Sequence, residues 1–187
     1  MPITITIAAV KAANPCADGL NRLLEVVGEG RAEDEPFALY VPSPADVSYA
    51  LWALARVGGE EGRRLGQRFA CDAAEHVLPI FERQYPGDNR PRKAIETTRA
   101  WLKGAATGQE RRMAWAEANA AAAWAATWAA AWAADAAWAA AADAATWAWA
   151  ADAATWAAKA ARVAAADAAQ ADERWWQMDR LNQMLKE

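Results

Sequence analysis

Residues 135–158 read DAAWAAAADAATWAWAADAATWAA, and this run decides what kind of fold the chain can form. It lies inside a longer segment, residues 114–171, in which 37 of 58 residues are Ala. Alanine is the strongest helix former because it loses no side-chain entropy in a helix. No Gly or Pro follows Gly108. The sequence therefore predicts a helical C-terminal segment over residues 109–187.

The large apolar residues of this segment favour helices that fold back over a single straight rod. On a helical wheel most of them fall on one side. They are Met113, Trp124, Trp128, Trp132, Trp138, Trp149, Trp156, Val163, Met178, Leu181 and Leu185. One helix of 79 residues would be about 118 Å long and would leave that side in water. We therefore expect a hairpin or bundle, in which Asp143 and Asp152 could cap new helices.

The indoles of the segment have three interpretations. Aromatic residues at helical spacing usually pack in a core. Some could instead face outward as anchors for a protein partner, since Trp is enriched in binding hot spots, or they could join copies of the chain into an oligomer. No Lys or Arg lies between Met113 and Ala158, so we predict an acidic contact surface for a partner with a basic surface. Its residues are Asp135, Asp143, Asp152, Trp138 and Trp147.

Residues 1–108 have a mixed composition and predict a multi-helix N-terminal domain. The apolar periodicity, the capping residues and the turn residues predict four helices. They are expected at Leu20–Val27, Pro44–Val57, Glu60–Arg83 and from Pro91 through Trp101. Ser43 would cap the second helix, and Gly28 and Gly58 would end the first two. Pro79 predicts a kink or a break in the third helix.

The stretch Ile3–Ile7 fits two structures. Its alternating β-branched residues suggest a strand, whereas Thr4 or Thr6 could cap a helix through Val10. We favour the helix, because a lone strand has no obvious partner. The whole chain is then all-α, with residues 1–108 as one domain and residues 109–187 as the Ala- and Trp-rich segment.

Composition excludes several classes of function. The chain carries 20 basic and 24 acidic residues, a net charge of −4, so it lacks the basic footprint of a nucleic-acid binder. The chain has no run of some 18 uncharged apolar residues, which a membrane span would need. We also expect no signal peptide, because the first residues lack its basic region. Two Cys and one His make neither a disulfide framework nor a metal site, and no nucleotide motif occurs. We expect a cytoplasmic protein without metal or cofactor, and not an enzyme.

Two short clusters carry polar chemistry. Asp72 and His76 sit four residues apart on one helix face, beside Cys71. We interpret them as a structural pair next to a buried Cys, since the spacing does not bring Cys and His together for catalysis. The basic residues Arg90, Arg92 and Lys93 open a helix, where an anion could bind. We expect them instead to form ion pairs with Asp88, Glu82 and Glu96.

Three stretches resemble the Imm-5-like immunity protein family. They are CDAAEHVLPIFE at residues 71–82, YPGDNRPRKAIE at residues 85–96, and Arg99-Ala100-Trp101 followed by Gly104. Members of that family also tend to end in long Ala-rich tracts with aromatic residues and Asp. The opening ANPCADG, residues 13–19, is similar to phage-encoded relatives.

The resemblance implies a small non-enzymatic protein that binds and neutralises another protein. The target would be a toxin or, for a phage-encoded member, a component of a host defence system, as for an anti-CRISPR protein. The alternative is a structural, self-associating helical module without a foreign target.

Overall fold

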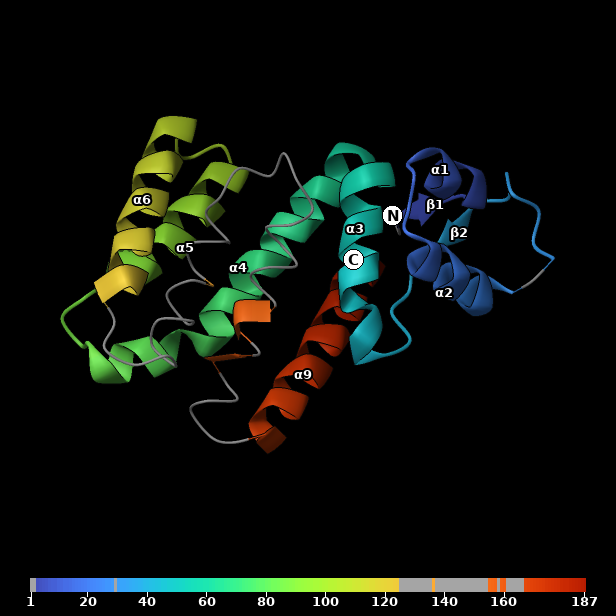
Figure 1. Cartoon of the computed structure of the whole chain (residues 1–187). Helices are drawn as coiled ribbons and strands as arrows, with labels where there is room; N and C mark the ends of the chain where they lie inside the picture. The colour runs from blue at the N-terminus through green and yellow to red at the C-terminus, as the bar shows by residue number, and fades with distance from the viewer. Residues whose placement is uncertain (1–2, 29, 125–135, 137–154, 158, 161–166) are drawn as a thin grey trace.

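The computed structural model describes residues 3–28, 30–124, 136, 155–157, 159–160 and 167–187 (Figure 1). Within these residues the fold is all-α, as predicted. The strands found there are β1 (Thr4–Ile5) and β2 (Phe37–Ala38), which pair antiparallel with Thr4 opposite Ala38. Figure 1 shows α1, α2 and the two strands at one end of the molecule, with α5 and α6 at the other. Helices α3, α4 and α9 lie between these two ends.

The stretch Ile3–Ile7 combines both predicted structures. Thr4 and Ile5 form β1, and α1 (Ile7–Ala12) begins directly afterwards. Thr6 caps α1, because its Oγ1 accepts a hydrogen bond from the Ala9 N–H at 3.1 Å. Our preference for helix was therefore wrong for Thr4 and Ile5. The strand finds its partner in β2, beyond α2 in the chain, and local sequence carries no sign of that pairing.

Two predicted helices of the N-terminal part are confirmed with shifted starts. Helix α2 (Ala17–Val27) ends at Gly28, and its cap is Cys16, whose Sγ accepts from the Gly19 N–H at 3.3 Å. Helix α3 (Val47–Val57) ends at Gly58. Before α3, Ser43 and Pro44 open a short 3₁₀ helix, η1 (Pro44–Asp46), in place of its first α-helical turn.

The central helix α4 (Gly59–Gln84) packs against α3 and against α5 (Arg90–Leu102). A Cβ on Gly62 would lie 2.3 Å from the Leu54 carbonyl oxygen, so only glycine lets α4 start so close to the end of α3. Helix α4 continues through Pro79, which lies exposed, so the predicted break is wrong. The start of α5 at Arg90 and Pro91 agrees with the sequence expectation.

Helix α6 (Gly108–Trp124) starts with a reciprocal cap that the sequence analysis missed. The Thr107 Oγ1 accepts from the Glu110 N–H at 3.2 Å, and the Glu110 carboxylate accepts from the Thr107 N–H at 2.7 Å. The helix lies along α5, where Ala114 and Ala118 bury against Ala94. Small residues allow this close approach of the two helices.

Helix α9 (Asp167–Lys186) folds back onto α3, α4 and η1. Its Leu181, Met184 and Leu185 join the main core. Asn182 is buried and pairs with the backbone of Val41 through two bonds of 2.8 Å. It accepts from the Val41 N–H and donates to the Val41 carbonyl oxygen, much as a neighbouring strand would.

As we expected, the C-terminal segment is thus not a free rod. The division of the chain into domains at residue 108 stays a prediction. Of the wheel residues named above, Met178, Leu181 and Leu185 are buried, whereas Met113 is 57% exposed. Most of the Trp residues of the run lie outside the described residues.

Candidate functional site

The predicted acidic contact surface falls on a part of the chain that the structure does not describe. Its residues Asp135, Asp143, Asp152, Trp138 and Trp147 all lie in the ranges 125–135 and 137–154, outside the described residues. That surface stays a prediction.

The Cys71 and His76 cluster has a structural role. Cys71 is fully buried, and burial raises the pKa of its thiol to about 12. A thiol in that state is a poor nucleophile near neutral pH. The His76 Nδ1 lies 2.6 Å from the Glu173 Oε2 on α9, and the imidazole stacks on Trp176 with ring centroids 3.9 Å apart. His76 therefore fastens α9 to α4.

Asp72 joins three helices. The pair that we predicted between Asp72 and His76 does not form. The Asp72 Oδ1 accepts from the Arg99 Nη2 on α5 at 2.8 Å, and its Oδ2 accepts from the Arg180 Nε on α9 at 2.7 Å. Arg99 also bonds Glu75. Two guanidinium groups from other helices attract the carboxylate more strongly than a half-exposed imidazole on its own helix.

The basic residues at the start of α5 are bound in ion pairs. Arg90 bonds Asp88 through Nε at 2.9 Å, and Arg92 forms a bidentate pair with Glu82 at 2.6 and 2.8 Å. The expected ion pairs of these two Arg are confirmed. The third residue, Lys93, lies 3.8 Å from Glu117 on α6 instead of pairing with Glu96.

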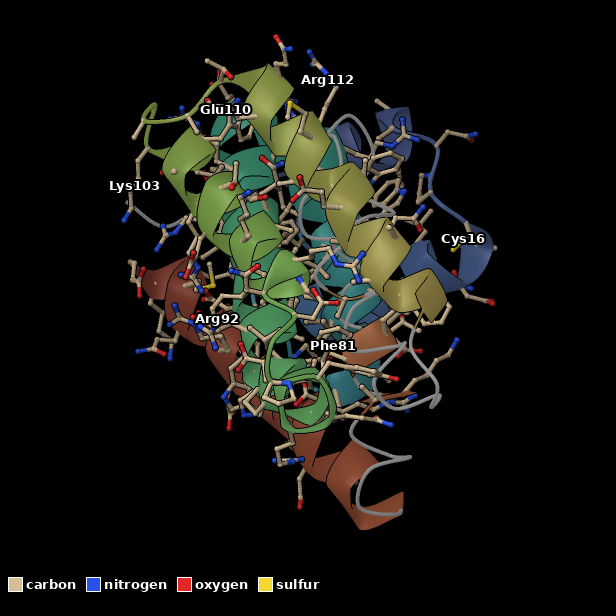
Figure 2. All side chains as sticks on the ribbon, turned by 90° about the vertical axis from the view of Figure 1, so that its left-hand side faces the viewer. Cys16, Phe81, Arg92, Lys103, Glu110 and Arg112 are labelled. Carbon is tan, nitrogen blue, oxygen red and sulfur yellow. The ribbon has the colours of Figure 1, made fainter. Side chains whose placement is uncertain are left out.

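An open apolar groove lies between α2 and α3, and we call it the α2–α3 groove. It has a volume of about 350 Å³. Its main apolar lining residues are Leu23, Val26, Tyr40, Tyr49, Trp52 and Ala53. Cys16 lies at its margin, and Figure 2 shows this residue at the edge of the molecule opposite Arg92 and Lys103. Figure 1 shows α2 at the end of the molecule opposite α5 and α6, so the groove is remote from those two helices.

The rest of the described chain covers the apolar face of helix α2 only in part. The helix has no fully buried residue, although Leu20, Leu23, Leu24 and Val27 line one side and touch the main core. Next to them Val26 is 39%, Tyr40 55% and Tyr49 38% exposed. Exposed large apolar side chains gathered in one groove are typical of a binding site, whereas single scattered ones are ordinary surface.

A bidentate ion pair holds α2 against η1 at the groove wall. Arg22 donates from Nε to the Asp46 Oδ1 at 2.8 Å and from Nη2 to Oδ2 at 2.9 Å, and the Ser43 hydroxyl donates to Oδ2 at 2.7 Å. These bonds, the Arg22 bond above all, lower the pKa of Asp46 below its ordinary value. Gly19 lies against the Tyr49 ring, which a Cβ would meet at 3.3 Å. Polar bonds thus fix the groove wall in addition to the apolar contacts of α2 with the core.

The segment that carries the groove wall is strongly acidic. Residues 16–46 contain seven acidic and two basic residues, a formal charge of −5, compared with −4 for the whole chain. Of the two Arg, Arg22 bonds Asp46 and Glu25, and Arg31 bonds Glu35. Asp18, in the first turn of α2, is exposed. The sequence analysis missed this concentration of charge, and the groove itself is formed by residues from four elements and their connections.

Two further searches cover only the described residues. No helix there is long and apolar enough to cross a membrane. No three His, Cys, Asp or Glu side chains come together there as metal ligands. The expectation that the chain needs no metal or cofactor stays a prediction.

Comparison with known families finds a match that covers more than half of the chain. Residues 59–184 match the family described as Imm-5 like putative immunity protein, which confirms the resemblance drawn from residues 71–104. The match runs from the first turn of α4 to the last turn of α9, whereas the α2–α3 groove is formed by residues that precede it. Searches of the curated proteins and of the solved structures found no match.

Proposed function

We propose that this chain, which belongs to the Imm-5 like putative immunity protein family, neutralises another protein by binding it stoichiometrically. The observation that carries the proposal, beside the family, is the α2–α3 groove with its exposed Val26, Tyr40 and Tyr49. Aromatic and aliphatic anchors of this kind dominate the energy of protein interfaces. We place the contact with the target in this groove.

The side chains best suited to chemistry are used in internal contacts. Cys71 is buried, His76 bonds Glu173, and Asp72 bonds two Arg. This use supports a non-enzymatic role, in which the protein acts by occupying its target.

The target in this proposal is a toxin of the producing bacterium, met in the cytoplasm. A phage-encoded antagonist of a host defence component would use the same stoichiometric binding. The acidic residues and indoles at Asp135, Trp138, Asp143, Trp147 and Asp152 would supply a second contact with a basic target.

Co-expression tests the proposal. The products of the genes beside this one are each expressed in a bacterium with and without this chain, and growth is followed. We expect one product to arrest growth, this chain to relieve the arrest, and the two proteins to elute as a complex of fixed stoichiometry. Relief of arrest without any complex would contradict neutralisation by binding.

Self-association is the competing role. Sedimentation of the purified chain alone measures it. A stable oligomer at micromolar concentration, together with no relief of arrest by any variant or wild type, would favour the structural module over the binding protein.

A further inference from the structure

We infer that the α2–α3 groove takes a basic amphipathic helix of the partner protein, whose apolar face fills the groove and whose Lys or Arg side chains face the acidic residues of α2. The inference rests on the proposed function, because it names the part of the target that the groove would bind.

The shape of the groove favours a helix. Its two walls are α2 and α3, and the small residues Ala50 and Ala53 of α3 line it. Apolar anchors at positions i, i+3 or i+4 and i+7 of a bound helix would reach Leu23, Val26 and Tyr49 in turn. Helix α2 would then gain the covering for its apolar face that the described part of the chain does not provide.

The charge of the wall favours a basic occupant. Helix α2 carries two exposed acidic residues, Asp18 and Glu25, and one basic residue, Arg22. The charged residues that line the groove itself are Arg22 and Asp46. The positive charge of Arg22 is already used by Asp46 and Glu25, while Asp18 is exposed beside them. Complementary charge speeds association and sets partner choice, so a helix rich in Lys or Arg fits and an acidic helix is repelled.

The same charge argues against two other occupants. A symmetric dimer through this groove would bring the exposed Asp18 and Glu25 of two α2 helices together, which costs binding energy. The chain's own run between Met113 and Ala158 has no Lys or Arg and four acidic residues, so it does not complement the wall either.

The experiment uses the full chain and designed peptides. The first probe is an 18-residue helical peptide with Leu and Trp on one face and Lys elsewhere, labelled for fluorescence anisotropy. The second has Glu in place of every Lys, and the third is a scrambled Lys peptide without an apolar face. We expect the first to bind at least tenfold more tightly than either of the others. Equal binding of the first and third would overturn the inference, because it would reflect charge alone.

Cys16 gives a readout located at the groove. It is exposed and lines the groove, whereas Cys71 is buried, so the neutral reagent N-ethylmaleimide should modify Cys16 alone. A saturating amount of the basic peptide should slow this reaction severalfold. An unchanged rate would show that the peptide binds elsewhere and would overturn the inference.

Matched variants complete the test. The double variant Val26→Ser, Tyr49→Ser and the double variant Asp18→Lys, Glu25→Lys should each weaken binding of the basic peptide at least tenfold. The control Met113→Ser removes an exposed apolar side chain from α6, one that is 57% exposed, and should leave binding unchanged. Circular dichroism shows whether each variant keeps its helices, and an unfolded double variant is replaced by its single substitutions.

The inference and the proposed function can fail separately. If both double variants relieve growth arrest as well as the wild type, the groove does not bind the target, although the protein still neutralises it. If no neighbouring gene product is neutralised even by the wild type, the proposed function fails, whatever the peptides do.

Discussion

The two ends of this molecule are held together by different means. Around α4, large side chains such as Phe69 and Phe81 are completely buried. Asp72 and His76 tie α4 to α5 and α9 through side-chain bonds. Helix α2, by contrast, has no buried side chain. Its Leu20, Leu23, Leu24 and Val27 pack against the core but are only partly buried, and the Arg22–Asp46 ion pair ties the helix to η1.

In our proposal the α4 region accounts for the stability of the fold, and the α2 region accounts for recognition of the partner. Burial of apolar surface contributes roughly 25 cal/mol per Å², so the fully buried side chains of α4 contribute more to the folding free energy than the half-exposed side chains of the groove. In the groove, Val26, Tyr40 and Tyr49 keep much of their surface in water, and their apolar area remains available to a partner. The difference also follows the family match, which includes α4, α5 and α6 but not the groove.

The sharpest test of this comparison removes one apolar side chain from each region. Phe69→Ala, in α4, should cost about 3–5 kcal/mol of the free energy of unfolding, because it leaves a cavity. Val26→Ser, in the groove, should change that free energy by at most about 0.5 kcal/mol. Urea denaturation followed by circular dichroism measures both. Similar losses from the two variants would mean that α2 belongs to the core.

The buried Asn182 should show nearly as large an effect. Asn182→Leu leaves the N–H and the carbonyl oxygen of Val41 without their partner, and each such buried group costs about 1–3 kcal/mol. We expect a total loss of about 2–4 kcal/mol in urea denaturation. Gln183→Leu, at the next and exposed position of α9, is the control. If the two variants unfold at the same urea concentration, the Asn182 bonds contribute nothing.

The Asp72 cluster should have a smaller effect. Asp72→Asn removes the charge that Arg99 and Arg180 share, and we expect a loss of about 1–3 kcal/mol, because both Arg are partly exposed and regain water. Glu60→Gln, which removes an exposed pair with Arg64 at 3.8 Å, should change stability little. Thermal unfolding of both variants and the wild type gives the comparison, and a loss no larger than that of Glu60→Gln would refute the linking role.

The smallest expected effect is an acid sensitivity at the groove wall. The Arg22 bond lowers the pKa of Asp46 in the folded state below its ordinary value of about 3.9. The unfolded state therefore binds the proton more readily, and stability rises with pH in this window. The contribution is complete above about pH 5 and is lost as pH falls through the folded-state pKa.

Asp46→Asn should remove this part of the pH dependence. Unfolding free energies at about pH 5 and about pH 3 should differ less for the variant than for the wild type. Asp34→Asn, at an exposed position of the loop after α2, should keep the wild-type difference. A variant with the full wild-type difference would show that Asp46 does not link α2 to η1 in solution.

Much of the helical structure was predictable from local sequence. The ends of α2 and α3 at Gly28 and Gly58 follow from the glycines, and α5 starts where Pro91 suggests. The burial of Leu181 and Leu185 followed from periodicity alone. Met113 shows the limit of the wheel, because it shares their side but lies in a different helix that packs on α5 through Ala.

The candidate site was much less predictable. Sequence reasoning correctly placed Cys71 in the interior, but it paired His76 with Asp72 instead of with Glu173. The true partner lies almost a hundred positions away, where no local pattern points to it. The groove was missed for the same reason, because its lining comes from α1, α2, η1, α3 and the connections between them.

By itself the sequence determined where helices form and end, since propensity, caps and glycines act within a few residues of the chain. It also determined the family and the net charge. Only the tertiary structure decided which faces are covered: that α9 returns to bond Val41, that Asp72 joins three helices, and that α2 keeps an open apolar face. The physical reason is that burial and ion pairing depend on residues distant in the chain, and only folding brings these residues together.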